Sequence, residues 1–214
     1  MTRSEAPHAP HDAVIAGNVY DKYETRNPVA RRLMAGFDRG MFELLAGTGP
    51  VASVLEVGCG EGHVTAKLAR TYPGAHVLGT DVSGEIVEQA RRLHPGLDFR
   101  AQSIYDLDRM DQRFELIVAC EVMEHLDDPD AALAAIARAR PRFLFVSVPR
   151  EPIWRVLNVL RGRYLGALGN TPGHVQHWSR AGFMRTLERH VEVLAVRSPL
   201  PWTQALCSPK PVSS

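Results

Sequence analysis

Three side chains that commonly bind metal ions lie within the short sequence CEVMEHL. Glu121, Glu124 and His125 directly follow the apolar run ELIVAC, whose composition and length predict a buried strand. A carboxylate at such a strand end must reach solvent or find a partner, because burying it alone costs several kcal/mol. A divalent cation is one such partner, since residues three apart project to the same side of a helical turn. Local packing without a metal is the alternative.

A second source of imidazole groups is the segment NTPGHVQHW. It contains His174 and His177 and follows the strand-like run RFLFVSVP, so both histidines are expected at the same sheet edge as the acidic cluster. Either imidazole could complete a metal site, and His177 could instead act as a general base. A histidine beside Trp178 that only packs is the alternative. Glutamate and histidine ligands together favour Mg²⁺ or Mn²⁺ over Zn²⁺ or Fe²⁺.

Three glycines follow another apolar run, VASVLEV, in the sequence GCGEG. Gly58, Gly60 and Gly62 are spaced for a sharp strand-to-helix turn whose backbone approaches a ligand closely. Glu56 stands two residues before this turn. Its carboxylate would repel a pyrophosphate and attract an ammonium group, which disfavours a nicotinamide dinucleotide as the ligand. A tight turn without any ligand is the alternative.

Asp81 closes the next apolar run, AHVLGTD. An aspartate at that place can accept hydrogen bonds from a ribose diol in the crevice at the carboxyl ends of parallel strands. Val82 follows it and could pack against an adenine face.

The elements expected to position these residues alternate along the chain. Strand-like runs are separated by helical patterns, an order typical of an α/β protein whose parallel sheet is covered on both faces. The last two runs are separated by a Ser-Pro turn and predict a hairpin at the sheet edge. The expected strands lie at residues 51–58, 75–82, 97–101, 115–120, 142–149, 191–199 and 201–208, and the expected helices near 61–72, 84–93, 129–139 and 179–190.

One domain of residues 18–208 is expected for this 214-residue chain, with loose tails at 1–17 and 209–214. Within the domain, residues 18–48 are expected to form an N-terminal helical lid, and residues 150–178 are expected to form a cap and loop at the sheet edge. The helix of the N-terminal segment is expected to start at the Asn27 cap with Pro28 in its first turn. Its apolar positions recur at helical spacing: Val29, Leu33, Phe37, Met41 and Leu44.

The composition argues against several classes of partner. A net charge of +1 gives no general attraction for nucleic acid or for an anionic membrane. Three scattered cysteines suggest a reducing compartment, and the lack of a long apolar stretch or signal sequence predicts a soluble, cytoplasmic protein of unknown oligomeric state.

The stretches VLEVGCGEG, GTDVS and FELIVACEVMEHL occur together and in this order. Over about residues 50–208, the chain therefore resembles the class I S-adenosylmethionine-dependent methyltransferases. The resemblance implies a Rossmann-like fold with a mostly parallel seven-stranded sheet, and S-adenosyl-L-methionine as cofactor. It implies that Glu56 and the glycine turn hold the methionine portion and that Asp81 holds the ribose hydroxyls.

The resemblance places the adenine edge against Ser103 and Ile104. Ser103 departs from the family pattern, in which an aspartate often stands at this position. Cys59 and Cys120 are expected near the cofactor as well, without a chemical role. Tyr23 belongs to the N-terminal segment that related enzymes place over the cofactor, although packing on the core would suit it equally.

The acidic cluster and the later histidine extend the resemblance to two metal-dependent groups. These are the ubiquinone-pathway O-methyltransferases and the enzymes that 2′-O-methylate the 3′ ends of small RNAs. Metal-independent relatives carry a similar acidic run, so metal-free catalysis remains open. The metal ligands that the resemblance implies are Glu121, Glu124, His125 and His174.

Methyl transfer from a sulfonium is an in-line displacement, so the protein must position a nucleophile and remove its proton. A divalent ion bound to a catechol- or diol-like metabolite would orient the acceptor and lower the pKa of its hydroxyl. His177 and His125 are the candidates for the proton transfer. Arg150 is the candidate for gripping a carboxylate or phosphate of the acceptor, while the arginines after it suit a solvated helix face.

A small-molecule acceptor is preferred to RNA, because the chain has neither a broad basic surface nor an RNA-binding domain. The alternatives are a metal-independent N- or O-methyltransferase, an RNA 3′-terminal 2′-O-methyltransferase, and a noncatalytic regulator that only binds the cofactor.

Overall fold

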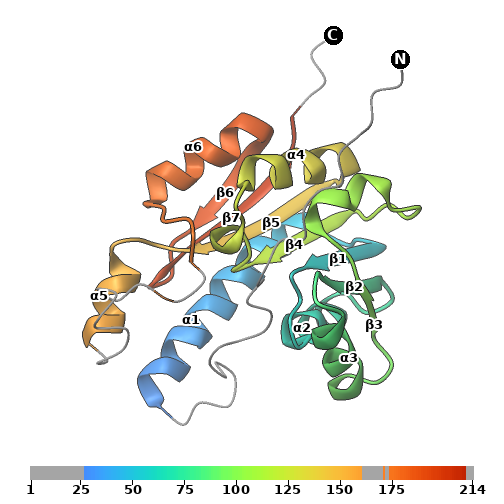
Figure 1. Cartoon of the computed structure of the whole chain (residues 1–214), viewed down its shortest axis with the longest axis horizontal. Coiled ribbons are helices and arrows are strands. Elements are labelled where there is room, and N and C mark those ends of the chain that lie inside the picture. Colours follow the sequence, from blue (N-terminus) through green and yellow to red (C-terminus); the bar gives the residue numbers. More distant parts are fainter. Residues whose placement is uncertain (1–26, 161–170, 172–173, 211–214) are drawn as a thin grey trace, which may run out of the picture.

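The computed structural model of the chain describes residues 27–160, 171 and 174–210 (Figure 1). A seven-stranded sheet runs through its centre in the order β3-β2-β1-β4-β5-β7-β6. The pairs among β1 to β5 are parallel, whereas β7 runs antiparallel to β5 and β6, which confirms the predicted sheet and its hairpin. The strands are β1 (Ser53–Val57), β2 (His76–Asp81), β3 (Asp98–Ala101), β4 (Leu116–Cys120), β5 (Phe143–Pro149), β6 (Val191–Arg197) and β7 (Trp202–Pro209).

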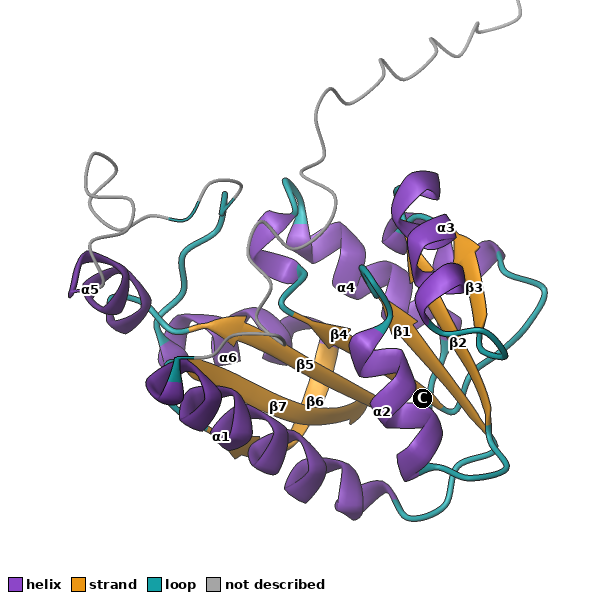
Figure 2. Cartoon of the chain, turned by 90° about the horizontal axis from the view of Figure 1, so that it is seen from below, coloured by secondary structure: helices purple, strands orange, loops and turns teal. Residues whose placement is uncertain are grey.

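Helices lie on both sides of the sheet (Figure 2). Apolar residues of α1 and α2 pack on one face, and those of α4 and α6 pack on the other, because successive strand side chains point to opposite faces. The α-helices are α1 (Pro28–Leu45), α2 (His63–Thr71), α3 (Gly84–Leu93), α4 (Pro129–Ala139), α5 (Ile153–Leu160) and α6 (Arg180–His190), and short 3₁₀ helices are η1 (Ala46–Thr48), η2 (Ile104–Arg109) and η3 (Met123–His125).

The strands β1 and β4 are neighbours at the middle of the sheet, with Val57 opposite Ala119. From β1 the sheet continues through β2 and β3 in one direction, and from β4 it continues through β5 in the other. The carboxyl ends of β1 and β4 therefore form a topological switch point, where open α/β sheets bind their ligands.

Local capping explains why several helix starts were predictable. The Asn27 side chain accepts a hydrogen bond from the backbone N–H of Val29 at 2.9 Å, with Pro28 as the first helical residue. Asp128 caps α4 in the same way, accepting from Ala131 at 2.9 Å. Of the apolar residues at helical spacing in α1, Phe37, Met41 and Leu44 are buried, whereas Val29 in the first turn is 61% exposed.

Several predictions concern residues outside the described part of the chain. They include the tail at 1–17, the place of Tyr23, and the cap arginines Arg161 and Arg163. At the other end, β7 continues through Pro209, one residue past the predicted domain boundary. Among the helices of residues 27–160 and 174–210, none combines the length and the hydropathy needed for a bilayer crossing.

Candidate active site

The glycine turn after β1 has the backbone conformation that its sequence predicts. Gly58, Gly60 and Gly62 have φ angles of 66°, 53° and 83°, in the region that glycine adopts at little cost. A Cβ atom at Gly62 would lie 2.6 Å from the Phe99 ring, so close packing also requires glycine there. A Cβ at Gly60 would meet nothing within 4 Å, so this glycine leaves open space for a ligand.

Glu56 lies beneath this turn with only 2% of its surface exposed. Its carboxylate accepts a hydrogen bond from the hydroxyl of Thr65, in the first turn of α2. Burial raises the pKa of the Glu56 carboxyl to about 8, although the hydrogen bonds from Thr65 act in the opposite direction. A cationic ligand group beside this carboxyl would favour its ionised form.

Asp81 connects the end of β2 to the glycine turn. One carboxylate oxygen accepts from the backbone N–H of Gly60 at 3.0 Å, and the other accepts from Ser83 at 3.0 Å. Each carboxylate oxygen has a further acceptor site, so Asp81 can also accept from a ligand hydroxyl. Val82, the next residue, is 53% exposed and offers an apolar surface at the same edge.

The other predicted cofactor contacts have mainly local roles in the structure. The Ser103 hydroxyl caps η2 by accepting from Tyr105 at 3.2 Å, and Ile104 is part of the core. Cys59 is buried, and burial raises the pKa of the thiols of Cys59 and Cys120. Both thiols are therefore uncharged near neutral pH and are not nucleophiles.

The second candidate group forms at the carboxyl end of β4. Potential ligand atoms of Glu124, His125 and His174 all lie within 4.8 Å of one another. Glu124 and His125 belong to η3, and their partner comes from the segment before α6. The Glu124 side chain is 1% exposed, and the two imidazole rings are 5.0 Å apart between centroids.

The structure does not bring Glu121 into this group, although the sequence suggested it as a fourth ligand. Its backbone has a φ of 57°, and its carboxylate accepts from the Ser147 hydroxyl at 3.1 Å and from the indole N–H of Trp202 at 2.6 Å. The left-handed conformation thus turns Glu121 toward β5 and β7, while the 3₁₀ turn carries Glu124 and His125 elsewhere.

His177 does not belong to the group of three, and Arg150 has its own contacts after β5. The Nε2 atom of His177 is 3.0 Å from a guanidinium nitrogen of Arg155, and its Nδ1 atom is 3.8 Å from the Glu151 carboxylate. Arg150 pairs through its backbone with Trp178, just after β5, and donates its backbone N–H to Pro201 at 2.8 Å. Both residues lie between β5 and α6, the part of the chain predicted to form the cap.

The glycine turn and the second group lie next to each other. A Cβ atom at Gly58 would lie 2.5 Å from the side chain of Val122, which precedes η3 directly. This contact follows from the pairing of β1 with β4, whose carboxyl ends open side by side. The glycine turn and η3 are therefore neighbours at the carboxyl edge of the sheet.

Comparison with known proteins agrees with this geometry. Residues 54–140, from β1 to the end of α4, match the family described as Methyltransferase domain. A ubiquinone biosynthesis O-methyltransferase of Xanthomonas oryzae pv. oryzae is 32% identical over 168 residues, which cover 71% of this chain and 68% of that protein. The chain belongs to the class I S-adenosylmethionine-dependent methyltransferases.

Other relatives agree with this assignment at different coverage. A protein of the same name from Hahella chejuensis is 31% identical over 140 residues, which cover 61% of this methyltransferase and 57% of that relative. Magnesium protoporphyrin IX methyltransferase from Synechocystis PCC 6803 has a TM-score of 0.62 at 21% identity, covering 87% of this chain and 89% of that one. N-methyltransferase NodS from Bradyrhizobium japonicum has a TM-score of 0.60 at 19% identity, covering 87% and 90%. Both structures hold S-adenosylhomocysteine, and at these identities the likeness shows the fold.

The methyltransferase also contains site residues that the sequence did not single out. Thr65, on the buried side of α2, bonds Glu56, and a polar residue on an otherwise apolar helix face was an available signal. Ser147 was another such signal, because it interrupts the apolar strand RFLFVSVP. Trp154 and Trp202 join the site through ring contacts that no local pattern predicts, with centroids 5.9 Å apart.

Proposed function

We propose that this methyltransferase transfers the methyl group to an oxygen of a small hydroxylated acceptor, such as a catechol or a diol, with the help of a divalent cation. The observation that carries this function is the group of Glu124, His125 and His174 beside the glycine turn. Relatives named ubiquinone biosynthesis O-methyltransferase support oxygen as the methylated atom.

The donor set fits a divalent cation. Ligand atoms about 2.1 Å from one ion lie roughly 3–4 Å apart, so small side-chain movements would bring these three atoms onto a common centre. Two of the three donors are imidazole nitrogens, which suit Mn²⁺, Fe²⁺ or Zn²⁺ better than Mg²⁺. Because the Glu121 carboxylate lies apart from this group, two of the three donors are nitrogens, and we therefore propose Mn²⁺ ahead of Mg²⁺.

The cofactor side also fits its ligand. S-adenosyl-L-methionine supplies a methyl group on a sulfonium centre when it is bound. Glu56 offers a carboxylate to the ammonium of the methionine portion, Asp81 offers acceptor oxygens to the ribose hydroxyls, and Gly60 lets the backbone approach.

Aromatic rings line the second group. Trp154 stacks on the ring of His174, with centroids 6.0 Å apart and an angle of 26° between the planes. Such a flat apolar surface suits the ring of a catechol. Together with the net charge of +1, it favours a small aromatic or hydroxylated acceptor over RNA.

The acceptor hydroxyl must lose its proton during transfer. A divalent cation would supply the positive charge that lowers the pKa of this hydroxyl. We do not assign the proton to His177, because its Nε2 atom lies at hydrogen-bond distance from Arg155. Arg150 remains the candidate for contacting an acidic group of the acceptor.

The experiment measures Mn²⁺ binding by calorimetry and methyl transfer to catechol, used as the probe acceptor. We compare the native chain with Glu124→Gln and with His76→Gln, which changes a histidine at the amino end of β2. We expect one saturable Mn²⁺ site in the native chain and in His76→Gln, and binding weakened at least about 10-fold in Glu124→Gln.

Catechol methylation should stop with a chelator and return with Mn²⁺. A native chain that binds no Mn²⁺, or a Glu124→Gln variant that binds it equally well, would contradict the metal site. Methylation that ignores the chelator would leave a metal-independent methyltransferase.

A further inference from the structure

Gln176 lies two residues after His174 and bonds the turn that carries Glu124 and His125. We propose that Gln176 is a positioning residue, which holds His174 at the place where all three side chains can bind one cation. This inference rests on the proposed function, because it assigns Gln176 a part in the same metal site.

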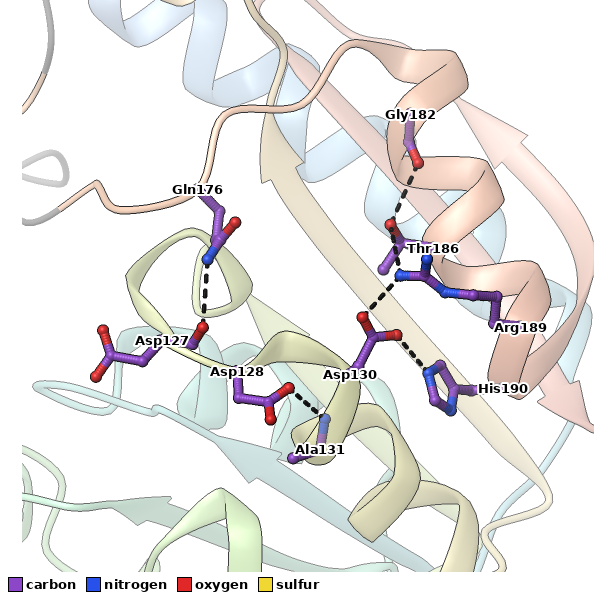
Figure 3. A network of polar contacts seen from close by, with 9 residues as sticks. All are labelled: Asp127, Asp128, Asp130, Ala131, Gln176, Gly182, Thr186, Arg189 and His190. Carbon is purple, nitrogen blue, oxygen red and sulfur yellow. Dashed lines mark hydrogen bonds and ion pairs between the residues drawn. The ribbon is translucent and has the colours of Figure 1, made fainter.

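The contacts of Gln176 span the whole turn. Its backbone N–H donates to the carbonyl of Glu124 at 3.0 Å, and the N–H of Val175 donates to the same carbonyl at 2.8 Å. The side-chain amide donates to the carbonyl of Leu126 at 3.2 Å and lies 3.5 Å from that of Asp127. Figure 3 shows the Gln176 side chain pointing from its loop to Asp127.

These contacts matter because His174 does not stand on a helix or a strand. The carbonyl groups at the end of a short 3₁₀ turn have no partners within the turn, so they accept hydrogen bonds from neighbouring segments. The backbone N–H groups of Val175 and Gln176 supply the bonds to Glu124, and the Gln176 side chain supplies those just after η3, which together set the register of the His174 segment. A shift of about 1 Å in one ligand is enough to weaken a metal site.

A second set of contacts joins α4, which follows η3 in the chain, to α6, which follows the His174 segment. Asp130, on α4, accepts from Arg189 at 2.7 Å and lies 2.6 Å from the Nε2 atom of His190, both on α6 (Figure 3). Among the described residues, this ion-pair group joins α4 to α6 and includes none of the three proposed ligands. It therefore offers a control for a purely structural effect.

The chemistry of the amide explains the choice of residue. One side-chain nitrogen with two N–H groups can donate to two carbonyls at once. A glutamate of the same length, when ionised, has no donor and would repel these carbonyl oxygens. Gln176→Glu therefore removes the side-chain contacts to Leu126 and Asp127, nearly conserves the side-chain volume, and leaves the backbone hydrogen bond to Glu124 in place.

The test measures Mn²⁺ binding by calorimetry in the full chain and in four variants. We expect Gln176→Ala and Gln176→Glu to bind Mn²⁺ on the order of 10-fold more weakly than the native chain. Binding of S-adenosylhomocysteine should be unchanged in both, which shows that they are folded. Asp130→Asn should lower the melting temperature and leave Mn²⁺ binding unchanged. Glu124→Gln should lose most of its Mn²⁺ binding.

The possible outcomes distinguish the role of Gln176 from the existence of the metal site. Native affinity in both Gln176 variants, together with weakened binding in Glu124→Gln, would overturn the role of Gln176 and leave the metal site standing. A native chain that binds no Mn²⁺ would overturn the proposed function and the role of Gln176 with it. Equal weakening in Asp130→Asn would reduce Gln176 to a general structural residue.

Discussion

Replacing Glu56 by glutamine should stabilise the protein, and more so at high pH. The Glu56 carboxyl has an ordinary pKa of 4.5, which burial raises to about 8 in the folded chain. Between these values the folded state keeps a proton that the unfolded state releases, so stability is full below pH 4.5 and is lost as the pH rises to 8. At about 1.4 kcal/mol per pH unit, the loss reaches about 5 kcal/mol.

The difference between the native chain and Glu56→Gln isolates this one carboxyl. From pH 6 to pH 8 the difference should grow by about 2 kcal/mol, because the slope of about 1.4 kcal/mol per pH unit falls to half at the folded-state pKa of about 8. For a domain of this size, that corresponds to roughly 5–10 °C in melting temperature. Thermal unfolding of both proteins, followed by circular dichroism at pH 6, 7, 8 and 9, measures this difference in melting temperature directly.

Glu192→Gln is the matched control, because Glu192 is exposed on β6. Its melting temperature should run parallel to that of the native chain across the pH series. If the Glu56→Gln curve also runs parallel, the neutral state of the buried carboxyl is refuted. Because glutamine cannot offer a negative charge to an ammonium group, Glu56→Gln should also bind S-adenosylhomocysteine at least about 10-fold more weakly.

Two further substitutions test the two halves of the site. Gly60→Ala should lower the stability by about 1 kcal/mol, because φ is positive, and should weaken S-adenosylhomocysteine binding more than about 10-fold in calorimetry. Gly74→Ala is the control, because Gly74 also has a positive φ, in a turn before β2; it should cost similar stability and leave S-adenosylhomocysteine binding unchanged. Equal affinities in the two variants would show that Gly60 does not border the cofactor. Glu121→Gln should bind Mn²⁺ as the native chain does, because its carboxylate faces Ser147 and Trp202, and a loss as large as that in Glu124→Gln would restore Glu121 as a ligand.

The sequence predicted those features of the fold that depend on local chemistry. The helices at 84–93 and 129–139 have the predicted bounds because Ser83 and Asp128 cap their first turns. The glycine turn was also readable, because positive φ angles at a strand end restrict the residue type. The alternation of strands and helices then led to the parallel sheet and to the site at its carboxyl edge.

The missed features depend on contacts between segments that are distant in the chain. Whether Glu121 joins Glu124 depends on Trp202, which reaches it from β7. The orientation of His177 depends on Arg155 in α5, and spacing within the loop carries no information about that contact. The protonation of Glu56 likewise depends on burial under α2, which the sequence of β1 alone does not show.

The most direct test of the central claim asks whether the methyl donor and the cation occupy the same edge of the sheet. S-adenosylmethionine labelled with ¹³C in its methyl group is bound to the protein, and the ¹³C relaxation is measured with Mn²⁺ and with diamagnetic Mg²⁺. We predict strong relaxation enhancement by Mn²⁺ in the native chain and its loss in Glu124→Gln. If both ligands are bound and Mn²⁺ leaves the methyl relaxation unchanged, the two sites do not meet and the account is contradicted.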